Sequence, residues 1–195
     1  MRNFAFARPF ALAFTALLLA ACAGPNHAEM QATFDAGLTQ YDAGNFKGAY
    51  DTWRKIEDVD LAALRNVALM LRKGEGVKKD PEAARQKMER AADMGLVTAQ
   101  ADLGEMVLNG EGGKPDPAGA VPWLGRAAAA GHPIAALELG EIFEAGNGAP
   151  KDLEAARRLY EIAAKTGSQE ATARLKALPP PPPSNSPATP DKSGH

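Results

Sequence analysis

The sequence predicts an all-α protein built from repeated helical hairpins. The chain has 195 residues, of which 45% are hydrophobic but only 6% are aromatic. Much of the apolar content is therefore alanine, which favours closely packed helices over a β core. The chain also matches itself without a gap when it is shifted by 36 residues. A fixed period of this length is typical of an α-solenoid, in which each hairpin stacks on its neighbours.

Four columns of this period hold the same residue type in three successive copies. Two glycines end the first helix of each copy, an aspartate precedes the second helix, and a third glycine follows it. Glycine adopts the left-handed backbone that ends a helix, and an aspartate side chain caps the start of the next one. The residues are Gly74, Gly76, Asp80 and Gly95, then Gly110, Gly112, Asp116 and Gly131, then Gly146, Gly148, Asp152 and Gly167. Each copy therefore reads as a helix, a turn and a second helix.

The remaining elements follow from this register, and we expect nine helices in all. An opening hairpin has helices over 34–43 and 46–56, and the helix over 61–73 begins the 36-residue copies. Pro122 lies inside a helix, where it should cause a kink or remove one hydrogen bond. Lys176 replaces a small residue in the last helix, as a terminal cap would. The predicted divisions are 1–21 signal peptide, 22–33 tether, 34–178 repeat domain (units 34–60, 61–96, 97–132 and 133–178) and 179–195 Pro-rich tail.

The N-terminus predicts export. Arg2 and Arg8 precede an apolar run over 10–21, which is the pattern of a secretory signal and is too short to span a bilayer as a mature helix. The run ends in LAAC, and Cys22 is the one cysteine of the chain. These four residues resemble the bacterial lipobox, which implies a lipid on Cys22, a palmitate-type anchor. An ordinary signal peptide with a chance cysteine is the alternative.

The repeats resemble a known family. In one copy Gly95, Ala99, Leu103, Gly104 and Gly110 carry its pattern, and the next copy adds an aromatic residue at Phe143. This pattern is similar to the Sel1-like repeat, a relative of the tetratricopeptide repeat (TPR). The resemblance covers about residues 34–178 and implies a TPR-like superhelix of α-hairpins that acts in protein–protein interaction. The disulfides of a cysteine-rich branch of this family are absent. For the lipobox, Ala23 in place of aspartate implies the outer membrane, facing the periplasm.

The sequence shows no catalytic constellation. No nucleophile has a histidine at a suggestive spacing, and His132 reads as a surface loop residue between helices. We therefore expect no enzyme activity, no cofactor and no metal. A pI near 6.0 also argues against nucleic acid as a partner. The stretch at 74–83 resembles a phosphate loop, but its lysines are not repeated in register, so it reads as a joint between helices.

The best candidate for binding is the polar face of the first helices. These positions point away from the packing stripe of Ala99, Leu103 and Val107 and would form an acidic groove suited to a basic peptide. The candidate residues are Asn66, Asp102, Glu105, Asn109, Glu138 and Glu141. Met70, Met106 and Ile142 flank this face or belong to the core.

The function expected from these observations is that of an envelope-anchored adaptor or scaffold with an unidentified protein partner. A periplasmic regulator of a signalling protein and a cell-wall ligand-binding or enzyme accessory protein are the alternatives. The Pro-rich tail is either a spacer or a ligand for a partner's aromatic groove.

Overall fold

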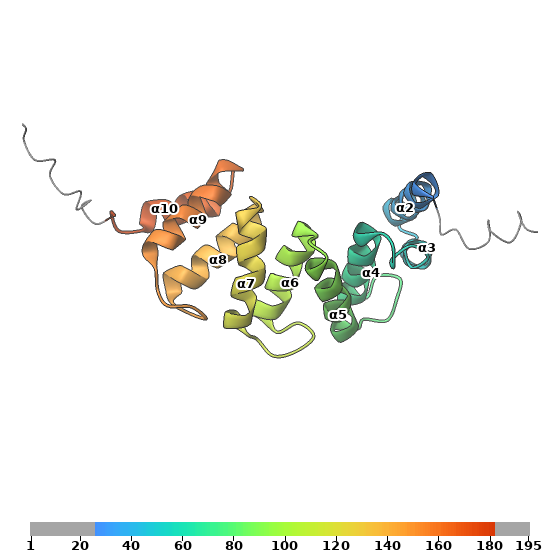
Figure 1. Ribbon diagram of the computed structural model, residues 1–195, viewed down its shortest axis with the longest axis horizontal. Coiled ribbons are helices and arrows are strands. Elements are labelled where there is room, and N and C mark those ends of the chain that lie inside the picture. The colour runs from blue at the N-terminus through green and yellow to red at the C-terminus, as the bar shows by residue number, and fades with distance from the viewer. Residues whose placement is uncertain (1–25, 182–195) are drawn as a thin grey trace, which may run out of the picture. The chain divides into compact units, whose positions relative to one another are not determined.

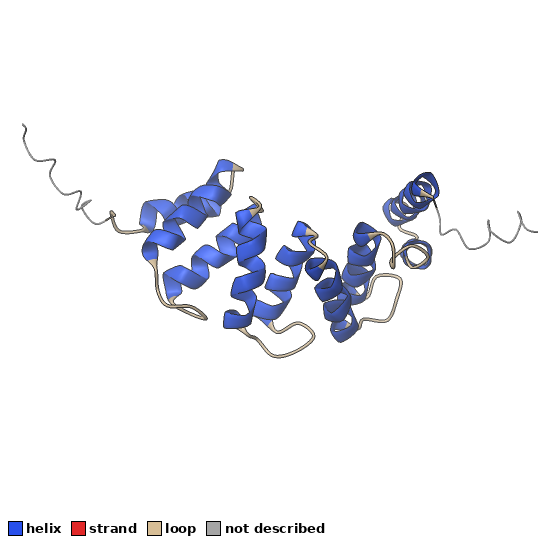
Figure 2. Cartoon of the chain, in the orientation of Figure 1, coloured by secondary structure: helices blue, strands red, loops and turns tan. Residues whose placement is uncertain are grey.

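The computed structural model describes residues 26–181 and shows an all-α fold (Figures 1 and 2). Nine helices and no strand occur within this range, which confirms the predicted fold class. The helices are α2 (His27–Asp42), α3 (Phe46–Trp53), α4 (Leu61–Lys73), α5 (Pro81–Asp93), α6 (Val97–Asn109), α7 (Pro117–Ala129), α8 (Pro133–Ala145), α9 (Leu153–Lys165) and α10 (Gln169–Ala177). The predicted signal peptide, Cys22 and most of the Pro-rich tail lie outside the described residues.

The chain forms two compact units, which divide after Lys79. The N-terminal unit contains α2, α3 and α4, with α3 packed against both of the others. Trp53 at the end of α3 is 3% exposed and lies against Gly37 of α2, where a β-carbon would collide with its indole ring. The glycine therefore sets how closely α2 and α3 approach.

The first helix is longer than predicted. It begins at His27, so part of the segment assigned to the tether is helical. Asn26 accepts a hydrogen bond from the backbone N–H of Glu29 at 3.0 Å, and the Glu29 carboxylate accepts one from the N–H of Asn26 at 3.2 Å. This reciprocal pair is a capping box, which satisfies two backbone donors at a helix start. It moves the start of the helix ahead of the predicted Phe34.

The C-terminal unit contains α5 to α10, and each of these helices packs on the next along the chain. Small residues on the first helices let the second helices approach. A β-carbon at Gly104 of α6 would lie 2.5 Å from Leu124 Cδ2 of α7, and one at Gly140 of α8 would lie 2.5 Å from Tyr160 Cε1 of α9. Leu124 and Tyr160 are fully buried at these crossings. Lys176 is exposed on α10, as expected for a terminal helix.

The joints between helices have the predicted chemistry. Gly110 ends α6 in the left-handed conformation, with φ of 74°. Asp116 then accepts a hydrogen bond from the N–H of Gly119 at 2.8 Å, which caps the start of α7. The equivalent glycines end α4 and α8, and the equivalent aspartates cap α5 and α9. The glycine-rich stretches are thus helix stops and starts.

Two local features add detail to the predictions. Helix α7 runs without a break from Pro117 to Ala129, so Pro122 removes a backbone donor, as predicted, and does not interrupt the helix. His132 is more than a loop residue, because its Nδ1 accepts a hydrogen bond from the N–H of Ala135 at 3.4 Å and caps α8. Within residues 26–181, no helix has the length and apolar character needed to cross a bilayer.

Candidate partner-binding face

The six candidate residues lie on the first helices of their repeats, in two separate units. Asn66 lies on α4 in the N-terminal unit, and the other five lie on α6 and α8 in the C-terminal unit. Asn109 is exposed and the rest are half-buried. The flanking residues Met70, Met106 and Ile142 are buried at 1%, 0% and 4% exposure, which confirms that they belong to the core.

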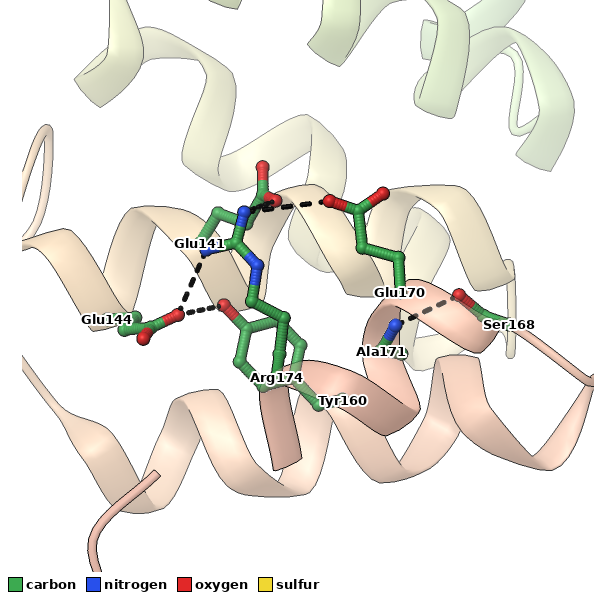
Figure 3. A network of polar contacts seen from close by, with 7 residues as sticks. All are labelled: Glu141, Glu144, Tyr160, Ser168, Glu170, Ala171 and Arg174. Atoms are coloured by element: carbon green, nitrogen blue, oxygen red, sulfur yellow. Dashed lines mark hydrogen bonds and ion pairs between the residues drawn. The ribbon is translucent and has the colours of Figure 1, made fainter. Parts of the chain in front are cut away.

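Glu141 on α8 is part of a polar network that the sequence analysis did not predict. The guanidinium of Arg174 on α10 lies 2.6 Å from Glu141 Oε1 and 3.3 Å from Glu144 Oε2 (Figure 3). Glu170, one turn earlier on α10, adds a third carboxylate at 3.6 Å. Glu141, a candidate residue of the acidic face, is therefore paired with an arginine from the last helix.

Burial changes the protonation of this network. Removal of Glu141 from water raises its pKa above the ordinary value, and this effect exceeds the opposing attraction of Arg174. The nearby Glu170 and Glu144 raise that pKa further. The hydroxyl of the buried Tyr160 donates a hydrogen bond to Glu144 at 2.6 Å, and burial followed by this bond raises the pKa of Tyr160. The network therefore fastens α8, α9 and α10 together.

A signal for this network was present in the sequence. Arg174 stands 36 residues after Glu138, so it occupies the same column as Asn66, Asp102 and Glu138. Continuing the 36-residue period by one more repeat, from Glu138 to Arg174, would have predicted an arginine beside the carboxylates of α8. Asp102, Glu105 and Glu138 also make interactions within the chain. The face in this unit is thus a set of carboxylates that are positioned by neighbouring side chains.

In the N-terminal unit, the candidate residue Asn66 lines a pocket of about 180 Å³. Leu69 and Lys73 also come from α4, while Leu38 and Tyr41 come from α2. Trp53, Met70 and Glu75 complete the lining. The 36-residue period identifies Asn66 as equivalent to the acidic positions, whereas the aromatic wall from the opening hairpin was not predicted.

The start of the Pro-rich tail is held against the C-terminal unit. The Arg157 side chain on α9 donates a hydrogen bond to the carbonyl of Pro179, and the preceding Leu178 is 8% exposed. Nothing among residues 26–181 groups three or more metal-ligating side chains.

Comparison with known proteins identifies the repeats. The model of the Sel1 repeat matches residues 61–96, 97–132 and 133–168, so the chain belongs to the Sel1 repeat family. This family is a TPR-related helical repeat class whose members generally mediate protein–protein interaction and are generally non-catalytic. No curated protein matches the chain.

Solved structures show the same fold. A Sel1 repeat protein from Oxalobacter formigenes is 32% identical over 74% of this chain, with a TM-score of 0.69. The protein c5321, a protective antigen of uropathogenic Escherichia coli strains with an SLR fold, is 30% identical over 83% of this chain, with a TM-score of 0.72. This chain spans 59% and 35% of their respective lengths. Cysteine rich protein B of Helicobacter pylori, 22% identical with a TM-score of 0.53, covers 65% of this chain and 96% of its own. It shows the fold alone.

Proposed function

We propose that this protein is a non-enzymatic adaptor or scaffold that is anchored in the bacterial envelope by a lipid on Cys22. Membership of the Sel1 repeat family supports the binding role, because stacked hairpins expose a large surface on rigid helices. The LAAC sequence after an apolar run supports the anchor. Ala23 favours the periplasmic face of the outer membrane. A lipid anchor would raise the local concentration of the binding surface for partners in the envelope.

The observation that carries the binding role is the ion pairing on α8. Glu141 and Glu144 pair with the guanidinium of Arg174 in the same chain, so this face already binds one basic side chain at its C-terminal end (Figure 3). Asp102 and Glu105 occupy the equivalent face of α6, which contacts α8. A basic segment of a partner protein would meet complementary charge there.

Charge reversal tests this face. Asp102→Lys and Glu138→Lys together should remove specific partners from the set that is crosslinked to the protein in cells and identified by mass spectrometry. Glu161→Lys is the matched control, because Glu161 is exposed on α9 and should leave the set intact. An unchanged set in the double variant would disprove the proposed face.

The anchor has a separate test. Cys22→Ser removes the thiol that would carry the lipid, so the variant should move from the membrane fraction to the soluble fraction of the envelope. Lipid labelling with a fatty-acid analogue should be lost in parallel. A variant that remains in the membrane fraction would show that another feature holds the protein there.

A further inference from the structure

The pocket of the N-terminal unit has the size of a single large side chain. Its volume of about 180 Å³ is below the roughly 300–1,000 Å³ of pockets that hold small-molecule ligands. A leucine or an aromatic side chain would fill it. Leu38, which is 44% exposed, forms one edge, so apolar surface continues from the pocket to the outside.

The aromatic residues of this pocket have their polar atoms bonded elsewhere. The indole N–H of Trp53 donates to the carbonyl of Phe34 at 3.1 Å, and the hydroxyl of Tyr41 donates to Glu75 Oε2 at 2.7 Å. The bond to Glu75 raises the pKa of Tyr41, so the phenol keeps its proton. An occupant therefore meets ring faces and aliphatic carbons in the pocket.

Two polar groups at the pocket have unused hydrogen-bonding capacity. Within the described residues, the side-chain amide of Asn66 makes no hydrogen bond, and neither does the ammonium group of Lys73. Lys73 forms an ion pair with Glu75 Oε1 at 3.8 Å, which is longer than a hydrogen bond, and its side chain is 54% exposed. The two residues stand seven positions apart on α4, so they are separated by roughly 10 Å along the helix. An extended peptide covers that distance in about three residues.

We propose that this pocket binds an extended segment of the protein partner in which a bulky apolar residue is followed closely by an acidic side chain. The apolar side chain enters the pocket, the carboxylate pairs with Lys73, and the Asn66 amide bonds to the peptide backbone. This proposal rests on the proposed adaptor function and adds the chemistry of the ligand. It concerns the opening hairpin and α4, so it uses residues on α2 and α3 that lie outside the matched Sel1 repeats.

Charge and composition favour this occupant over others. Glu75 accepts a short hydrogen bond from Tyr41, while its ion pair with Lys73 is long, so the exposed ammonium group of Lys73 has donors left for a second carboxylate. Buried aromatic pockets of this size are the usual location of the few residues that dominate protein–protein affinity. A small polar ligand would leave the apolar walls unfilled.

The test uses the full chain and an array of amidated peptides in which a central Trp, Leu or Ala is followed by Asp, Asn or Lys. Peptides with a bulky centre and a following Asp should bind best. Leu38→Ser should weaken these peptides about tenfold, because it removes an apolar edge of the pocket. Val59→Ser is its matched control, since Val59 is also exposed and apolar in this unit but does not line the pocket.

A second variant pair tests the charge. Lys73→Glu should abolish the preference for Asp over Asn, while Lys78→Glu, an equal change at an exposed loop lysine, should preserve it. The proposal is wrong if no peptide with a bulky centre and a following Asp binds more tightly than the peptide with Ala and Asn at these positions. It is also wrong if the pocket variants bind the bulky–Asp peptide as tightly as their control variants do. Peptides with a free C-terminal carboxylate in place of the amide provide one more check. If they bind more tightly and show no preference for Asp, the pocket recognises the end of a chain and the proposal is wrong. The adaptor function itself would survive these results if the charge-reversal experiment on α6 and α8 still altered the partner set.

Discussion

Single glycines in these repeats serve two distinct physical purposes. Gly131 has φ of 84° and no heavy atom within 4 Å of the place where a β-carbon would stand. Gly112 has a similar φ of 73°, but a β-carbon there would collide with the backbone carbonyl of Pro81. The first glycine is needed for its backbone conformation, and the second is needed also for a close approach between segments.

This difference predicts unequal costs for the same substitution. Gly131→Ala should lower the free energy of unfolding by about 1 kcal/mol, the cost of a left-handed alanine. Gly112→Ala should cost about 3 kcal/mol, because displacement of packed backbone adds to that term. Urea unfolding of both variants measures the two losses. Equal losses would contradict the close packing assigned to Gly112.

A single residue, Glu141, is expected to make the stability of the protein depend on pH. Its folded-state pKa is raised, chiefly by burial, so the carboxyl keeps its proton to a higher pH in the folded chain than in the unfolded chain. The stability contributed by this group is therefore largest below the ordinary carboxyl pKa and declines as pH rises through the raised value.

We expect the stability of the unmodified protein relative to Glu141→Gln to fall as pH rises above the ordinary carboxyl pKa of about 4. Glutamine does not titrate, so the variant lacks this dependence. Unfolding measured over this rise in pH provides the comparison, with Glu161→Gln as a control at an exposed site. A relative stability that rises with pH would mean that attraction to Arg174 outweighs burial.

At the scale of whole helices, start and stop signals explain most of what the sequence predicts correctly. Helix α6 ends at Gly110 and α7 starts at Asp116 because each residue has a local backbone role that does not depend on distant contacts. The start of α2 was missed although Asn26 and Glu29 carry a readable capping-box pattern. Local chemistry thus sets the helix boundaries in both cases.

Pro122 offers a test of helix energetics. It lies in the interior of α7, where proline removes an N–H donor and crowds the carbonyl four residues earlier. Pro122→Ala should therefore stabilise the protein by about 2 kcal/mol, after allowance for the greater entropy of the unfolded chain. Because Pro122 is exposed, no core contact is lost.

Pro117→Ala is the control for this change. Pro117 occupies the first position of the same helix, where proline is well tolerated, so its replacement should give no stabilisation. Thermal unfolding of the two variants separates these positions. If Pro122→Ala were no more stable than the unmodified protein, the helix would have to accommodate the interior proline without cost.

The candidate site was less predictable than the helices. The sequence identified which positions share the polar face, because that follows from the period, and one of them, Asn66, lines the pocket in the N-terminal unit. It did not reveal that Arg174 neutralises Glu141 or that Trp53 and Tyr41 build the pocket wall. Those contacts join different helices, and their geometry depends on how the helices pack.

At the scale of the whole molecule, the two proposed binding sites lie in different compact units and differ in chemistry. The N-terminal unit has a pocket with aromatic walls beside Lys73, and the C-terminal unit has carboxylates on α6 and α8, two of which pair with Arg174. An adaptor with both features could recognise a partner through an apolar anchor and through charge. Specificity would then arise from the combination of the two.

The most direct test of the adaptor role places a photoreactive amino acid at Asn109 on α6, or at Glu161 on α9, in the full chain in living cells. Both positions are exposed in the same unit, but only Asn109 belongs to the candidate face. We predict that illumination crosslinks the Asn109 variant to one or a few envelope proteins, while the Glu161 variant gives none of these products. Identical products from both positions, or no protein crosslink from Asn109, would contradict the account.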